Sequence, residues 1–174
     1  MMPINVTHTA IATPQVHARI LSPKATLETS ELPAPATNLR HTLSTLITYF
    51  AEAYKLTFGF NDGPPLHDCL TIAYLAAPEL FKTTRHRVDI ELNGTHSIGE
   101  TIVDVWKYRK CDDTWGRDGR NCQVAEWLDV RFYSSLGGDT CPHVGLLQVP
   151  GFFDLLIGVI AHCDTVSPLN KQSV

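Results

Sequence analysis

The chain has 174 residues, of which 44% are hydrophobic, which is enough apolar side chain to build the core of one domain. Its formal net charge of −4, with no long basic block, argues against a nucleic-acid partner. The longest apolar run, residues 152–161, is broken by Asp154 and is too short to cross a bilayer, and the N-terminus lacks the pattern of a secretory signal. We therefore expect a cytoplasmic protein with no membrane partner.

The N-terminal region is predicted to hold a short strand, a helix and a loop. Residues 2–7 read as the strand. Thr13 before Pro14 is typical of a capped helix start. The inward residues of this helix would be Val16, Ile20 and Leu21. Residues 22–38 are rich in proline, serine and threonine, which indicates a loop.

A long amphipathic helix is predicted next, with Asn38 as its cap. Apolar residues recur at helical spacing along it: Leu39, Leu43, Leu46, Ile47, Phe50 and Tyr54. One face of this helix should therefore be buried.

The most informative stretch is residues 61–68, where a glycine and two prolines precede an adjacent His67 and Asp68. The rigid bend would place this pair in the first turn of a buried, apolar helix over residues 68–77, where backbone N–H groups favour a carboxylate. A hard carboxylate beside a titratable imidazole suits metal-assisted hydrolysis. The plainer interpretation is that Asp68 only caps the helix.

The second half of the chain is predicted to contain strands and a final helix. Residues 88–92 alternate apolar with acidic side chains, and residues 100–108 would form the second strand of a pair. A polar loop over residues 110–121 leads to a further strand at 122–130. Pro150 opens the last helix, whose apolar residues are Phe153, Leu156, Ile157 and Ile160.

The five cysteines form no C-x-x-C pair, so reduced thiols are the default expectation. Cys69 is predicted to be a small buried residue within its apolar helix. A zinc site is an open alternative with irregular spacing, and its ligands would be Cys111, Cys122, Cys141 and His143.

The phrase Gly63-Pro64-Pro65-Leu66-His67-Asp68, with residues 73–75 and 78–81 after it, resembles the signature near the C-terminal end of the inosine–uridine-preferring nucleoside N-ribohydrolases. Residues 2–8, 88–104 and 149–156 resemble other stretches of this family in the same order. The resemblance extends from residue 1 to about residue 163. It implies an α/β fold: the C-terminal portion of a mostly parallel sheet flanked by helices, with a late strand pair.

The resemblance also implies an activity, namely calcium-dependent cleavage of the N-glycosidic bond of a ribonucleoside to ribose and free base. His67 would be catalytic, by protonating or hydrogen-bonding the departing base, and Asp68 would be a metal ligand to Ca²⁺. Tyr49, Phe50 and Tyr54 are candidates for stacking on the base, but they fit a core stripe as well, so no substrate-binding residue is assigned. The implied partners are the ribonucleoside and further copies of the chain.

Part of the family pattern has no counterpart here. The aspartate-rich motif that supplies most calcium ligands and the base is not found, and the one Asp-Asp pair, Asp112-Asp113, follows no apolar strand. Residues 1–174 are therefore expected to form a single partial domain without its N-terminal half, inactive on its own. Residues 131–148 interrupt the pattern as an inserted loop or a segment that normal splicing would remove.

Two other functions remain open on the sequence. The chain could be a non-catalytic relic that serves as a binding or interaction module. Alternatively it could be a two-carboxylate glycosidase, since Asp89 and Glu91 would lie on one face of a predicted strand.

Overall fold

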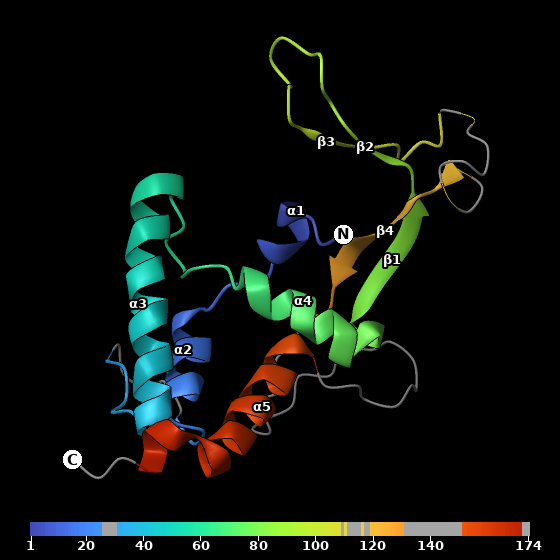
Figure 1. The fold of residues 1–174 in the computed structure, drawn as a ribbon. Helices are drawn as coiled ribbons and strands as arrows, with labels where there is room; N and C mark the ends of the chain where they lie inside the picture. The colour runs from blue at the N-terminus through green and yellow to red at the C-terminus, as the bar shows by residue number, and fades with distance from the viewer. Residues whose placement is uncertain (26–30, 109, 111–115, 117–118, 131–150, 172–174) are drawn as a thin grey trace, which may run out of the picture.

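The structure, a computed structural model, describes residues 1–25, 31–108, 110, 116, 119–130 and 151–171 (Figure 1). Helices open and close this part of the chain, and the strands lie between them. The α-helices are α1 (Ile4–Thr7), α2 (Pro14–Leu21), α3 (Asn38–Phe58), α4 (His67–Ala76) and α5 (Phe152–Val166). Two short 3-10 turns, η1 (Pro78–Leu80) and η4 (Pro168–Lys171), follow α4 and α5.

The predicted start of α2 is confirmed, because the Thr13 side chain accepts a hydrogen bond from the Val16 N–H and Pro14 occupies the first turn. The predicted cap of α3 is wrong by one residue. Thr37, not Asn38, accepts the capping bond, which comes from the Arg40 N–H. Helix α3 ends at Gly59, whose φ of 75° gives the left-handed conformation common at helix ends.

The strand predicted over residues 2–7 is wrong, since Ile4–Thr7 forms the single helical turn α1. The N–H groups of Val6 and Thr7 bond back to the Pro3 carbonyl oxygen. The Thr7 hydroxyl donates to the Ile4 carbonyl oxygen, a local bond that competes with a strand ladder. The turn buries the Val6 and Thr7 side chains.

Two small antiparallel sheets make up the described β-structure. Strand β1 (Phe81–His86) pairs with β4 (Cys122–Leu128), and β2 (Val88–Ile90) pairs with β3 (Thr101–Val103). The late strand pair and the strand after residue 122 are thus confirmed, whereas β1 was not predicted. Because both sheets are antiparallel, the described residues do not confirm a mostly parallel sheet.

The core gathers α2, α3 and α5 on one side and the β1–β4 sheet on the other, with α1 and α4 between them (Figure 1). Its buried residues include Val6, Val16, Ile20, Ile47, Leu70, Phe81, Leu128, Phe152, Phe153, Ile157 and Ile160. Two of the three inward residues predicted for α2 and three of the four predicted for α5 are among them, and the third residue of α2, Leu21, is buried as well. On α3 only Ile47 of the predicted stripe is fully buried, and Leu46 and Phe50 are exposed.

Helix α4 is apolar, as predicted, but it is not a buried helix. Only Leu70 and Ala73 are buried, while Ile72 is 66% and Leu75 is 78% exposed. Cys69 is exposed as well, so its predicted burial is also wrong. Within the described residues, the helix packs on its inner side against α1 and η1. No described helix is both long and apolar enough to cross a membrane.

Candidate active site

The loop before α4 is fixed against residues 10–12. The Ala12 N–H donates to the Pro64 carbonyl oxygen and the Leu66 N–H donates to the Ala10 carbonyl oxygen, both at 2.9 Å. Gly63 has a φ of 127°, and a Cβ there would meet the Ala12 carbonyl oxygen. The rigid bend predicted from the sequence therefore comes from contact with the preceding segment as well as from its prolines.

His67 is the first residue of α4, and its ring is held on both nitrogens. Nδ1 lies 2.7 Å from Oγ1 of Thr7, and Nε2 lies 2.7 Å from the hydroxyl oxygen of Tyr54. Since the Thr7 hydroxyl donates its hydrogen to Ile4, it accepts from Nδ1–H of His67. The Nε2 atom of a neutral ring then accepts from the Tyr54 hydroxyl.

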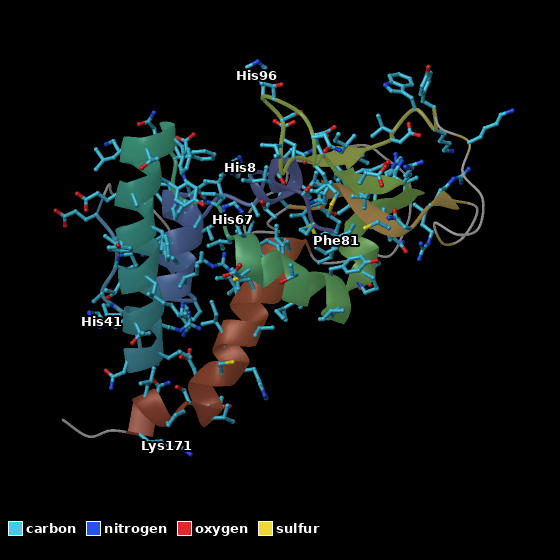
Figure 2. All side chains as sticks on the ribbon, turned by 45° about the horizontal axis from the view of Figure 1, so that its top comes forward. His8, His41, His67, Phe81, His96 and Lys171 are labelled. Carbon is cyan, nitrogen blue, oxygen red and sulfur yellow. The ribbon has the colours of Figure 1, made fainter. Side chains whose placement is uncertain are left out.

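Aromatic rings surround this imidazole. The centroid of the His8 ring lies 5.4 Å from that of His67, and the two residues come from α1's end and α4's start (Figure 2). Phe60 packs edge-on against His8 at 5.0 Å and against Tyr54 at 5.7 Å. Three separate segments thus converge on His67.

Burial lowers the pKa of His67, the positive charge of His8 lowers it further, and the carboxylate of Asp68 partly opposes both. A lowered pKa favours the neutral imidazole, which agrees with the hydrogen-bond roles assigned above.

Asp68 lies in the first turn of α4 with an exposed side chain. Leu66, not Asp68, occupies the cap position, so the interpretation of Asp68 as the helix cap is not supported. A carboxylate here faces the positive end of the helix dipole. Calcium takes six to eight oxygen ligands, and no described residues form a cluster of three or more metal-binding side chains. The described residues by themselves do not fit a calcium site.

Thr7 and Tyr54 are the site residues that the sequence did not reveal as partners of His67. Tyr54 was considered for base stacking, and its helical spacing gave no sign of the hydrogen bond to His67. Tyr49 and Phe50 are exposed and contact each other, with their ring centroids 5.5 Å apart.

The alternative sites find little support. Asp89 accepts a hydrogen bond from Nε of Arg87 at 2.7 Å, and Glu91 accepts the N–H groups of Asn93 and Gly94 in the turn after β2. Both carboxylates therefore have local structural roles. Of the zinc candidates, Cys111, Cys141 and His143 lie outside the described residues, as do Asp112-Asp113 and the segment 131–148.

Fold and site together define an α/β protein with an imidazole–carboxylate pair at a helix start. The chain belongs to the inosine-uridine preferring nucleoside hydrolase family, whose sequence model matches residues 1–135. The family resemblance inferred from the signature is thereby confirmed.

Individual relatives are named as ribonucleoside hydrolases. The chain is 36% identical over 110 residues to a probable ribonucleoside hydrolase of Dictyostelium discoideum, a match that covers 63% of this chain and 30% of that protein. It is 35% identical over 107 residues to the pyrimidine-specific ribonucleoside hydrolase RihA of Citrobacter koseri, covering 61% of this chain and 30% of that one.

Solved structures give a consistent picture of the fold. A purine-preferring ribonucleoside hydrolase from Gardnerella vaginalis aligns with a TM-score of 0.53 at 25% identity, covering 75% of this chain and 35% of that one. A plant nucleoside hydrolase aligns with a TM-score of 0.54 at 18% identity, covering 73% and 36% respectively, a likeness of fold alone. The chain spans about a third of the length of these relatives.

Proposed function

We propose that this chain carries the leaving-group half of a nucleoside hydrolase site, which cleaves a ribonucleoside to ribose and free base. The observation that supports this most directly is the fixed imidazole of His67 at the start of α4, inside the family signature. When water adds to the sugar carbon, the bonding electron pair moves to the base nitrogen. That nitrogen is stabilised by a proton or a hydrogen bond.

In this proposal His67 acts in its protonated form: with a proton on Nε2 it donates to the base nitrogen, either directly or through the Tyr54 hydroxyl that contacts Nε2. Thr7 keeps the ring oriented by accepting from Nδ1. An imidazole suits the task because its ordinary pKa lies near neutrality; the lowered pKa of His67 makes its protonated form a stronger proton donor. The Tyr54 ring contacts both the imidazole of His67, at a centroid distance of 5.8 Å, and the Phe60 ring, at 5.7 Å.

We further propose that Asp68 provides one carboxylate ligand to Ca²⁺, and that the other ligands and the water-activating base come from elsewhere than the described residues. When bound, such an ion would orient hydroxyl oxygens and acidify water. On this basis the chain alone is inactive. We also propose that the family's mostly parallel sheet is completed outside the described part of the chain.

The experiment that tests His67 uses a chimera in which this chain's matched region replaces the corresponding third of the Dictyostelium relative. Release of base from inosine and uridine is measured. We expect His67→Ala to lower kcat by at least about 100-fold, because general acid catalysis is lost. The matched control is His41→Ala, which removes an exposed histidine of α3 far from His67 (Figure 2).

Unchanged turnover in the His67→Ala chimera would exclude this residue from the mechanism. If the unmutated chimera folds and binds nucleosides but cleaves none, the non-catalytic binding module becomes the better account. Measurable base release by the 174-residue chain alone would contradict the proposed division of the site.

A further inference from the structure

The loop that joins β2 to β3 projects away from the helices (Figure 1), and His96 lies at its outer end (Figure 2). Near the start of this loop stands Asn93, whose side chain is exposed, followed by Gly94. Asn93 is the only asparagine of the chain that precedes a glycine. Because glycine has no Cβ, its backbone nitrogen reaches the side-chain carbonyl carbon of the preceding asparagine with little steric hindrance. The pair is therefore suited to an intramolecular reaction.

The packing of the loop favours glycine at position 94. A Cβ there would lie 2.5 Å from the Oγ atom of Ser97 and 3.0 Å from the Cγ atom of Glu91, so any other residue requires these side chains to move. Asparagine before glycine is also the pair that tight turns between antiparallel strands prefer. The reactive dipeptide thus follows from the way in which the loop closes.

The carboxylate of Glu91 is placed on the nitrogen that would react. Its Oε1 atom accepts the Asn93 N–H at 2.8 Å and the Gly94 N–H at 3.0 Å. The main chain of Glu91 is itself fixed, since its N–H donates to the Glu100 carbonyl oxygen and its carbonyl oxygen accepts the Gly99 N–H. An amide N–H is a weak acid, so attack by its nitrogen needs a base, and an ionised carboxylate is a pure acceptor that can take the proton.

We propose that Asn93 is a modification site, at which the chain converts its own asparagine to aspartate and isoaspartate with Glu91 as the base and water as the co-reactant. The Gly94 nitrogen attacks Cγ of Asn93 and forms the new C–N bond of a cyclic succinimide, while its proton passes to Glu91. The C–N bond of the side-chain amide breaks, and the leaving nitrogen takes up that proton and departs as ammonia. Water then opens the ring at either carbonyl carbon. This reaction does not depend on the proposed hydrolase activity.

The products change the loop in charge and in length. Aspartate places a second carboxylate beside that of Glu91, where the two negative charges repel. Isoaspartate adds a methylene to the main chain between Asn93 and Gly94, so the two N–H groups no longer fit one carboxylate oxygen. Hydrogen exchange of the backbone amides in residues 91–100 should therefore become faster as the modified fraction grows.

The test incubates the full 174-residue chain at neutral pH for several weeks and follows its proteolytic peptides by mass spectrometry. We expect Asn93 to lose its amide and both aspartate and isoaspartate to appear in its place. The internal control is Asn61, which is also exposed but is followed by Asp62, and which should keep its amide. An Asn93 that reacts no faster than Asn61 would overturn the proposal. Aspartate without isoaspartate would overturn it too, because direct hydrolysis of the amide passes through no ring.

Glu91→Gln tests the base, because glutamine keeps an oxygen acceptor for the two N–H groups and removes the charge. Circular dichroism checks that the variant is folded. The rate at Asn93 should fall at least about ten-fold, as expected when a general base is lost. The matched control, Glu100→Gln, removes an exposed carboxylate of the same loop and should leave the rate unchanged. In urea, where Glu91 is no longer held against Gly94, the unmutated chain and Glu91→Gln should react equally fast. An unchanged or faster rate in folded Glu91→Gln, or a difference that persists in urea, would overturn the role of Glu91.

Discussion

The imidazole of His67 draws its two hydrogen-bond partners from α1 and α3, which are separated from it by 60 and 13 residues in the sequence. The sequence allowed His67 and Asp68 to be placed together at a helix start, because the bend and the apolar run are local signals. Thr7 could not be assigned, since its segment was predicted to be a strand and nothing local links it to residue 67. Partners of this kind depend on tertiary packing.

Asp68 can be tested by removing its charge while keeping its shape. In the chimera described above, Asp68→Asn should weaken calcium binding by at least about ten-fold, because a carboxylate ligand is lost from the ion. Calorimetric titration with calcium measures the affinity. Asp62→Asn, which neutralises an exposed carboxylate in the preceding loop, is the control and should leave the affinity unchanged. Equal affinities for the Asp68→Asn variant and the unmutated chimera would remove Asp68 from the ligand set.

Among the elements, the helices were the more predictable. Periodicity located α2, α3 and α5 because it is a feature of consecutive residues, whereas of these three helices only α2 had its side-chain cap correctly predicted. Strand β1 was not predicted, because buried and exposed side chains do not alternate along it as strand prediction requires. The alternation is broken where its pairing with β4 shifts register, between Lys82 and Thr83. The exposure of Ile72 and Leu75 on α4 could not be predicted from the sequence either. The helix is apolar on nearly all sides, so its composition does not indicate which side the other elements cover.

The loop that precedes α4 gives a prediction at the same scale. Gly63→Ala should destabilise the chain by at least about 2 kcal/mol, because the added methyl meets the Ala12 carbonyl oxygen at an unfavourable φ. Gly59→Ala is the matched control: it also has a positive φ, but open space surrounds its Cβ, so a cost of about 1 kcal/mol is expected. Urea unfolding measures both. Equal costs would show that the contact with Ala12 does not constrain the loop.

Across the whole molecule, one ion pair joins the N-terminal helices to α5. Arg40 is fully buried, and its Nε lies 2.5 Å from the Asp164 carboxylate, while its Nη1 donates to the Ile20 carbonyl oxygen at 2.6 Å. The Asp164 carboxylate also accepts the hydroxyl of Thr37 and the side-chain amide of Asn170. Nη2 of Arg40 has no hydrogen-bond partner among the described residues, which makes this guanidinium depend heavily on Asp164.

Asp164→Ala should therefore cost about 3 kcal/mol of unfolding free energy, because it leaves a buried cation uncompensated. The double variant Arg40→Met, Asp164→Leu should cost less than the single one, since no buried charge remains. Urea unfolding measures each variant. The control is Lys82→Ala, which breaks an exposed pair with Glu126 and should change stability by less than about 1 kcal/mol. A double variant as unstable as the single one would refute the charge argument.

The same pair has a pH signature. Burial raises the pKa of Asp164, but hydrogen bonds from Thr37 and Arg40 and the charge of Arg40 outweigh it, so the pKa lies below its usual range. The stabilisation is complete above the unfolded-state pKa of about 4 and is lost as the pH falls through the lower folded-state value. The stability gap between the unmutated chain and Asp164→Asn should accordingly shrink below pH 4. A gap that is constant with pH would contradict this.

Along α4, Asp68, Ile72 and Leu75 are spaced four and three residues apart and are all exposed, so they share one side of the helix. A surface that shields the two aliphatic side chains from water would also dehydrate the carboxylate, which then needs a compensating positive charge beside it. Covering this side of α4 and taking up a cation are thus thermodynamically linked, and by reciprocity each strengthens the other.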